Sequence, residues 1–270
     1  MPELPEVETI KNALQNICVN TIIIASDIYT YKLRYKVLPN LSNIITSQKI
    51  ISVERRAKYI ILTLSNGHLI LHLGMAGKIY ITQRYQKYSH EHMTIHLNNH
   101  FTISFCDHRR FGAIIWTNNL LKEHPLIKNL GIEPFSRMFQ VEYLYKKCLA
   151  RKVSIKTLFM EGKVVSGIGN IYANEILFYS NIMPDRRTNS ISFQECKQIY
   201  KFIKIVLNKA IEAGGTSIRD YRTPNNKLGN FTKQLLIYGR NGQDCLKCNG
   251  IVMKMTQNNR STYYCSKCQV

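Results

Sequence analysis

The sequence predicts an α+β protein of more than one domain, in which an antiparallel β domain precedes a helical part and a metal-binding hairpin. Three observations support this. Short segments rich in isoleucine, tyrosine and threonine fill the chain to about Trp116, helical periodicity follows, and four of the eight cysteines lie in the last 26 residues. Many short strands with tight turns are typical of an antiparallel sandwich or barrel.

An amphipathic helix is expected before the strands. Val7, Ile10, Leu14 and Ile17 recur at helical spacing, and Pro5 suits the first helical turn. The expected strands are residues 21–29, 49–55, 59–64, 69–73, 78–82, 93–96 and 101–105, with hairpin turns at Asn66-Gly67 and Asn98-Asn99.

The pattern breaks at residues 118–135, where prolines and glycines predict an interdomain linker. Helices are then expected at 155–160, 171–178 and 192–211. The last of these opens with a capping box, Ser192 to Glu195, and ends at Gly214-Gly215. The turn Gly167-Ile168-Gly169-Asn170 opens a helix and suits a phosphate, although a plain helix–helix turn has the same pattern.

Composition indicates the partner. The formal net charge is +20 and the pI about 9.7, while 45% of residues are hydrophobic, so the chain is too apolar for a disordered basic tail. A polyanion, most simply nucleic acid, is the expected partner, and an acidic membrane surface is the weaker alternative. The opening does not resemble a signal peptide and no run is long enough for a membrane span, so we expect a soluble intracellular protein.

The terminal cysteines carry the most specific motif. Cys245 and Cys248 are separated from Cys265 and Cys268 by sixteen residues, a spacing typical of a zinc site. Four thiolates complete the tetrahedral coordination of Zn²⁺, so one structural ion is expected. Strands at 251–256 and 261–264 would flank Asn258-Asn259 and place Arg260 just after the turn. Alternatively, Arg260 is one more solvated charge.

The first residues suggest covalent chemistry. Removal of Met1 would leave Pro2 as a secondary amine, whose attack on an aldehyde-like carbon gives a cationic iminium. Glu3 is placed to act as an acid or base. Taken alone, the same residues also suit an ordinary helix start.

Four stretches together resemble the formamidopyrimidine-DNA glycosylase family. They are Pro2-Glu3-Leu4-Pro5-Glu6-Val7-Glu8, Arg55-Arg56-Ala57-Lys58-Tyr59, the run from Gly167 to Glu175, and the four-cysteine finger. The resemblance implies an N-terminal β-sandwich with a flanking helix, a helix–two-turn–helix domain and a zinc ribbon. The expected boundaries are 1–117, 118–135 (linker), 136–230 and 231–270.

The resemblance also implies a bifunctional glycosylase and AP lyase of base excision repair. Its partner would be double-stranded DNA with oxidised purines, such as 8-oxoguanine or formamidopyrimidines, or with abasic sites, and strand cleavage would follow by β,δ-elimination. Pro2 would attack the sugar, Glu3 and Lys58 would transfer protons, Arg260 would clamp a phosphate, and Glu6 would support the site.

Further residues follow from the resemblance. Phosphate contacts are expected from His72, His90, Arg109, Arg110, Arg151, Lys152 and Asn170. The wedge that fills the gap left by the flipped base would be Met75, Arg109 and Phe111, and without the resemblance Met75 and Phe111 would count as core residues. The loop over the flipped base would include Thr216, Ser217, Ile218, Arg219 and Tyr221.

One departure is visible. The family usually has Asp-Pro-Arg-Arg-Phe, whereas this chain has His108 in place of the proline. Loss of that fixed φ would loosen the wedge loop, but the arginines and the phenylalanine remain, so an altered rate or lesion preference is the most that we expect. Two alternatives stay open: an endonuclease VIII-like preference for oxidised pyrimidines, and a non-catalytic protein that binds damaged DNA.

Overall fold

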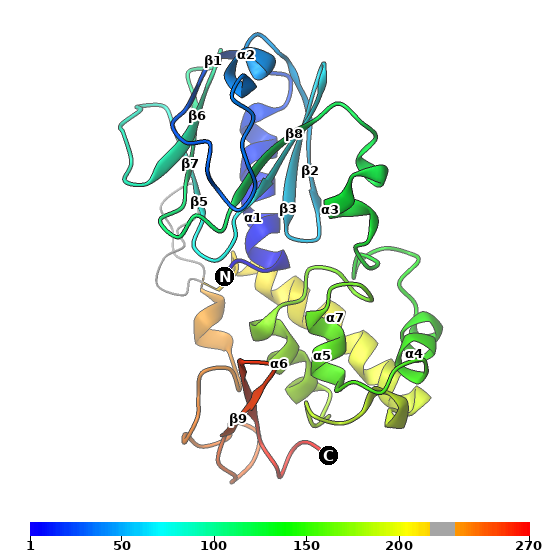
Figure 1. The fold of residues 1–270 in the computed structure, drawn as a ribbon. Coiled ribbons are helices and arrows are strands. Elements are labelled where there is room, and N and C mark those ends of the chain that lie inside the picture. The colour runs from blue at the N-terminus through cyan, green and yellow to red at the C-terminus, as the bar shows by residue number, and fades with distance from the viewer. Residues whose placement is uncertain (217–229) are drawn as a thin grey trace. The chain divides into compact units, whose positions relative to one another are not determined.

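The structure, a computed structural model, describes residues 1–216 and 230–270 of the chain. The chain forms two compact units. The first comprises Met1–Lys128 and Ala213–Asn230, and the second comprises Asn129–Glu212 and Phe231–Val270 (Figure 1). The domain boundaries expected at residues 117, 135 and 230 stay a prediction.

Two four-stranded antiparallel sheets build the first unit. One has the order β1-β6-β7-β5 and the other β2-β3-β4-β8. Their bounds are β1 Ile23–Ile28, β2 Ile50–Arg56, β3 Tyr59–Leu64, β4 Gly67–His72, β5 Lys78–Thr82, β6 Glu91–Leu97, β7 Thr102–Cys106 and β8 Ala113–Thr117. The predicted β-sandwich is confirmed, and β8, which the expected strands do not include, completes the second sheet.

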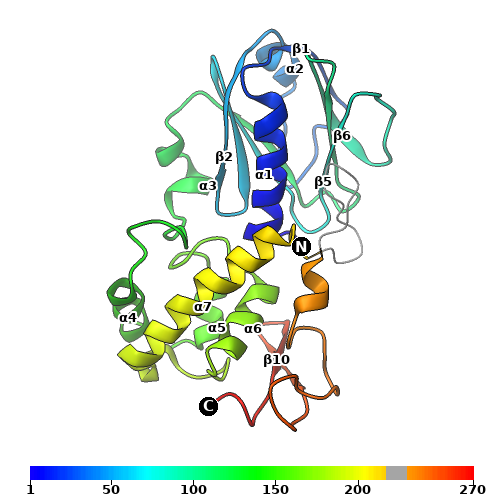
Figure 2. The same cartoon turned by 180° about the vertical axis from the view of Figure 1, so that it is seen from behind.

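Helix α1 (Leu4–Cys18) packs its apolar face into the core of the sandwich. Ile10 and Leu14 are fully buried there, together with Ile60 of β3 and Ile95 of β6, so one core joins the helix to both sheets. Figure 2 shows α1 lying along the sandwich between the two sheets. Three short elements complete this unit: α2 (Leu41–Ile45), η1 (Leu121–Glu123) and α3 (Pro125–Lys128).

Helices dominate the second unit. They are α4 Val141–Leu149, α5 Ile155–Met160, α6 Asn170–Tyr179 and α7 Phe193–Glu212, with the short turns η2 Thr188–Ser190 and η3 Phe231–Gln234. The predicted capping box opens α7, since the Ser192 N–H donates to Glu195 at 2.8 Å and the Glu195 N–H donates to Ser192 Oγ at 3.2 Å. Helix α6 is buried along almost its whole length, and α5 and α7 pack against it.

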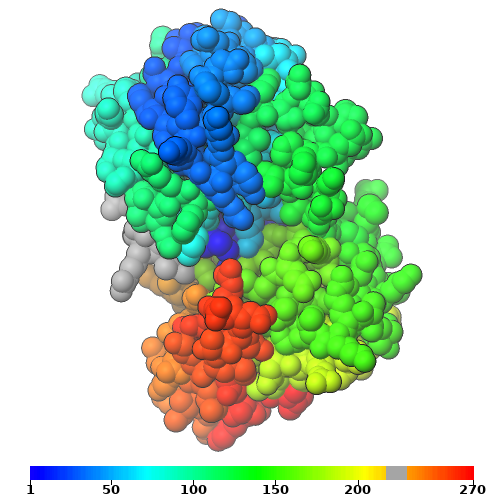
Figure 3. Space-filling model, viewed as in Figure 1, coloured from blue at the N-terminus to red at the C-terminus, as the bar shows by residue number. Residues whose placement is uncertain are grey.

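The chain ends in a hairpin of β9 (Met253–Gln257) and β10 (Arg260–Tyr264). Asn258 and Asn259 both have positive φ, which a tight two-residue turn requires and which asparagine tolerates. In the space-filling view, residues 231–270 form one continuous orange-to-red surface (Figure 3). Among the described residues, no helix combines the length and the apolar character needed to cross a bilayer.

The core predicts a clear difference between two apolar substitutions. Leu14→Ala should lower the free energy of unfolding of the first unit by about 2–5 kcal/mol, because it removes methyl groups from a fully buried site. Ile24→Ala, at a side chain that is 58% exposed, should lower it by less than about 1 kcal/mol. Urea unfolding followed by the fluorescence of Trp116, the only tryptophan, measures both. Equal losses would contradict this description of the core.

Candidate active site

Helix α1 begins with two buried carboxylates. Glu3, the residue before the helix, and Glu6 form a capping box in which the Glu3 N–H donates to Glu6 Oε2 at 2.8 Å. Glu3 and Glu6 are only 1% and 2% exposed. The positive end of the helix dipole stabilises negative charge at this position. Pro2 directly precedes the buried Glu3 in the chain, and its role as the nucleophile stays a prediction.

Glu6 has a second set of partners. Its Oε1 accepts hydrogen bonds from the Thr216 N–H at 2.7 Å and from the Thr216 hydroxyl at 2.9 Å. Gly215 has φ +82°, and a Cβ at that position would lie 2.8 Å from Glu6 Oε1. Glycine is therefore needed for residues 215–216 to approach the helix start. Of the expected lesion loop, Thr216 lies here, and Ser217, Ile218, Arg219 and Tyr221 lie outside the described residues.

Lys58 and His72 lie close to each other. Lys58 sits in the two-residue turn between β2 and β3, and the next residue, Tyr59, pairs with His72 of β4. Burial, together with the positive charges of Lys58 and Arg34, lowers the pKa of His72 to about 4. The Gly74 N–H donates to His72 Nδ1 at 3.0 Å, as a neutral ring allows. At pH 7 His72 is therefore a neutral donor through Nε2 and not a cation. Arg34 belongs to this group, although the sequence analysis does not include it.

The expected wedge residues are exposed. Met75 is 43% and Phe111 44% exposed, so neither side chain belongs to the hydrophobic core. Their loops touch, because a Cβ on Gly74 would lie 2.4 Å from the carbonyl carbon of Phe111. The Arg109 guanidinium lies over the Phe111 ring, 5.0 Å from its centroid. The structure thus gathers an apolar pair and an arginine on one exposed site.

Asp107 holds the wedge loop without a proline at position 108. Its buried carboxylate accepts hydrogen bonds from the N–H groups of Arg109 at 3.1 Å and Gly112 at 2.7 Å. The Arg110 N–H donates to the Asp107 carbonyl at 3.3 Å, and His92 Nε2 lies 2.8 Å from the same oxygen. These hydrogen bonds hold the loop backbone on both sides of residue 108 without a proline ring, and the effect of His108 on rate or lesion preference stays a prediction.

A hollow of about 170 Å³ adjoins this loop. Its lining includes the predicted phosphate ligand His90 and also His108, whose ring centroids are 6.1 Å apart. Cys106 lines it as well, and burial raises the pKa of that thiol to about 12. Cys106 is therefore a neutral wall of the hollow at pH 7 and not a nucleophile.

A buried lysine fixes the start of β10 in the second unit. Lys156, 2% exposed, donates to the Ser261 carbonyl at 3.1 Å and to Thr262 Oγ1 at 2.6 Å. Asn170 Nδ2 donates to the same Ser261 carbonyl at 3.0 Å. These bonds hold the strand that begins with the exposed Arg260. Sequence analysis finds Asn170 but misses Lys156, whose one signal is a lysine inside an apolar helical segment.

The remaining predicted phosphate ligands lie on two surfaces. Arg109 and Arg110 are exposed in the wedge loop of the first unit. In the second unit, Arg151 is partly buried, with Nη1 3.4 Å from the Lys147 carbonyl, and Lys152 is exposed. The predicted site residues are therefore divided between the two units.

The four terminal cysteines are arranged as a metal site. Their sulfur atoms all lie within 4.8 Å of one another, and three of the Sγ–Sγ distances are 3.8, 3.6 and 3.3 Å. These spacings suit tetrahedral zinc with Zn–S bonds of about 2.3 Å. A Cβ on Gly250 would lie 3.2–3.3 Å from the sulfurs of Cys265 and Cys248, so glycine keeps the space clear. The residues fit one structural zinc ion.

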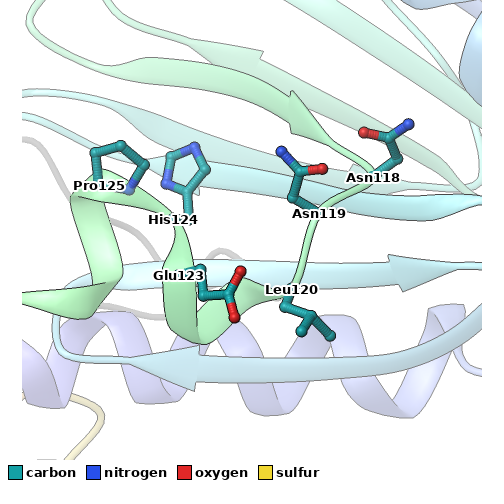
Figure 4. A pocket seen from close by; sticks show the side chains of 6 residues that line it. All are labelled: Asn118, Asn119, Leu120, Glu123, His124 and Pro125. Carbon is teal, nitrogen blue, oxygen red and sulfur yellow. The ribbon is translucent and has the colours of Figure 1, made fainter.

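A larger hollow, of about 590 Å³, lies away from all the predicted site residues. Figure 4 shows its lining: Asn118, Asn119, Leu120, Glu123, His124 and Pro125. Burial lowers the pKa of His124, so this imidazole is neutral at pH 7. With Glu123 as its one acid and a neutral histidine, this lining does not suit a nucleic-acid phosphate.

Comparisons with known proteins decide the family. Residues 1–114 match the formamidopyrimidine-DNA glycosylase N-terminal domain and residues 130–222 match the formamidopyrimidine-DNA glycosylase H2TH domain. The formamidopyrimidine-DNA glycosylase of Rickettsia africae is 44% identical over 271 residues, covering 100% of this chain and 99% of the relative. The chain belongs to the formamidopyrimidine-DNA glycosylase family. It is a DNA glycosylase with AP lyase activity.

Other relatives agree over the full length. The enzyme of Hydrogenovibrio crunogenus is 42% identical over 270 residues, covering 100% of this chain and 96% of that protein. Lactococcus lactis Fpg in complex with an abasic site containing DNA superposes with a TM-score of 0.90 at 30% identity, covering 99% of each chain. MutM (Fpg) from Thermus thermophilus gives a TM-score of 0.89 at 31% identity, with 99% and 98% covered. The predicted helix–two-turn–helix domain and finger are thus confirmed as the fold of the family.

Zinc removal should affect the second unit and leave the first unit folded. Complete chelation at pH 7 should abolish DNA binding, because the hairpin that carries Arg260 depends on the four thiolates, and should leave Trp116 fluorescence unchanged. Zinc release, DNA affinity and fluorescence are measured on the same sample, and readdition of zinc is the control. Full DNA affinity after complete zinc loss would contradict this prediction.

His72 should make stability depend on pH. Its pKa is about 4 in the folded chain against an ordinary value of 6.5, so between these values only the unfolded chain takes up the proton. The contribution of the neutral His72 to the free energy of unfolding is therefore fully present above pH 6.5 and is lost as the pH falls toward 4. His72→Asn keeps an acceptor for the Gly74 N–H. Between pH 7 and 4.5 its free energy of unfolding should fall by about 2 kcal/mol less than that of the wild type. Urea unfolding followed by Trp116 measures the difference. The exposed His100→Asn serves as control, and equal pH dependence in wild type and His72→Asn would refute the assignment.

Proposed function

We propose that this glycosylase and lyase excises oxidised purines, such as 8-oxoguanine and formamidopyrimidines, from double-stranded DNA and cuts the strand at abasic sites. Two similar structures support the substrate class: a Lactococcus lactis Fpg mutant in complex with a Fapy-dG containing DNA, and Lactococcus lactis Fpg in complex with an abasic site containing DNA. The net charge of +20 favours a polyanionic partner. We place the enzyme in the bacterial cytoplasm, acting as a monomer.

The observation that carries the proposed chemistry is the start of α1. Once Met1 is removed, the Pro2 nitrogen is a secondary amine beside the buried carboxylate of Glu3. Its lone pair forms a bond to C1′ of the flipped nucleotide, the glycosidic bond breaks, and the base leaves with the electron pair of that broken bond and takes up a proton. After ring opening, the resulting iminium accepts the electrons released when C2′ loses a proton. The 3′ phosphate then leaves, and a second elimination releases the 5′ phosphate.

Three side chains assist this sequence in our proposal. Glu3 donates and accepts protons during base loss and ring opening. Lys58 transfers protons and contacts a phosphate from the turn between β2 and β3. Arg260 clamps a phosphate through a guanidinium that stays protonated, which suits binding better than proton release.

Binding and base flipping use the exposed groups. Met75, Arg109 and Phe111 fill the gap left by the extruded base, whose unstacking costs a few kcal/mol. His90, Arg110, Arg151, Lys152 and Asn170 contact phosphates. His72 also contacts a phosphate, and it does so as a neutral donor because its pKa is about 4.

The proposal predicts that borohydride traps a covalent complex with a duplex that carries 8-oxoguanine, and that the sugar fragment is joined to residue 2. Pro2→Gly should reduce the trapping rate by about tenfold or more, because a primary amine replaces the secondary amine that forms the iminium. Pro125→Gly, at an exposed proline outside the site, should trap like the wild type.

Mass spectrometry of the trapped peptide and of the free N-terminus measures both points. A sugar joined to a lysine, or an active enzyme that retains Met1, would overturn the proposed nucleophile. Trapping with thymine glycol duplexes and none with 8-oxoguanine would overturn the substrate class instead.

A further inference from the structure

Two stretches that carry the family resemblance meet through side chains that have no role in the proposed chemistry. Arg55, at the end of β2, donates from Nε to Glu8 Oε2 of α1 at 2.5 Å. Lys11 holds the other oxygen of Glu8 at 2.8 Å. Burial raises the pKa of Glu8, but the hydrogen bonds from Lys11 and Arg55 outweigh it and lower the pKa below its ordinary value. Glu8 is therefore ionised at pH 7, and the pair is a charged one.

Arg55 makes a second contact, at the tip of the hairpin. Its Nη1 donates to the carbonyl of Ala57 at 3.0 Å. Ala57 has φ +54°, the left-handed region that glycine prefers and that costs other residues about 1–2 kcal/mol. Ala57 and Lys58 are the two residues of the turn between β2 and β3. The guanidinium thus braces an unfavourable backbone conformation one residue before Lys58.

The side chains involved are well enclosed. The Arg55 side chain is 9% and the Glu8 side chain 19% exposed, so the pair is less screened by solvent than a surface ion pair. A planar guanidinium bonds a carboxylate from one nitrogen and a carbonyl from another in one fixed geometry, which a lysine ammonium does not reproduce. Helix α1 is continuous from Leu4 to Cys18, so the position of Glu8 is tied to that of the helix start.

We propose that Arg55 is a positioning residue that sets Lys58 against the Pro2–Glu3 end of α1, through the chain Glu8–Arg55–Ala57. The inference rests on the proposed function, in which Lys58 acts together with Pro2. Arg55 itself does not touch the reacting atoms. It fixes the distance between a rigid helix that carries the nucleophile and a tight turn that carries the proton-transfer group.

His72 provides a readout of Lys58 that does not depend on activity. The positive charge of Lys58 is the largest contribution, after burial, that lowers the pKa of His72. A Lys58 that moves away from its place releases part of this effect, and the pKa of His72 rises.

The experiment compares Arg55→Gln, Arg55→Lys and a matched control, Arg186→Gln. Arg186 pairs with Glu195 at 2.5 Å and donates to the carbonyls of Ser190 and Val270, so it loses an equivalent set of bonds in the second unit. The measurements are the single-turnover rate of borohydride trapping, the affinity for a duplex with a reduced abasic-site analogue, the melting temperature, and the His72 pKa by NMR. Lys58→Gln gives the full effect of losing the lysine charge on His72.

Arg55→Gln should slow trapping at least tenfold and change DNA affinity less than about threefold, because Lys58 is misplaced while the other proposed phosphate contacts stay in place. Its His72 pKa should rise by about half of the rise seen in Lys58→Gln. The trapping rate and the His72 pKa of Arg55→Lys should lie between those of the wild type and Arg55→Gln. Arg186→Gln should match the wild type in both.

Three results would overturn the inference. They are an Arg55→Gln enzyme that traps like Arg186→Gln, an unchanged His72 pKa in Arg55→Gln, or equal losses of trapping and DNA affinity that follow the melting temperature. Failure of the wild type to trap would instead count against the proposed function, so the two failures are distinguishable.

Discussion

The buried carboxylate of Glu6 determines where the first residues of the chain lie. It accepts hydrogen bonds from the Glu3 N–H and from the N–H and hydroxyl of Thr216, so one side chain binds both the start of α1 and a segment two hundred residues later in the sequence. A buried carboxylate with three good donors is stable, whereas one that loses a donor carries a large desolvation penalty. The position of the Glu3 backbone, and of Pro2 bonded to it, depends on these hydrogen bonds of Glu6.

Other acids act in the same way. Asp107 accepts from two backbone N–H groups of the wedge loop, and Glu175, buried in α6, accepts from the N–H groups of Leu236, Ile237 and Tyr238 at 2.8–3.0 Å. Burial raises the pKa of Glu175, and these three donors act against that rise. The sequence has 17 acids against 37 lysines and arginines. The net charge of +20 that results gives the protein a positive potential that attracts a polyanion.

The sequence predicts the local features well. Periodicity, turn residues and cysteine spacing predict α1, most strands, α5 to α7 and the zinc hairpin, because each of these depends on neighbouring residues. Tertiary facts do not follow from such patterns. That Lys156 is buried under β10, that Arg55 reaches Glu8, and that burial keeps His72 neutral all depend on segments that are distant in the sequence.

The hold of Asp107 on its loop has a consequence for how this protein can change over generations. Its carboxylate and carbonyl fix the backbone on either side of residue 108, and the side chain at 108 is exposed. Selection is therefore free to exchange that side chain among rigid, charged and neutral types. Such exchanges alter the electrostatic potential next to Arg109 and Phe111 while leaving the backbone of this loop in place.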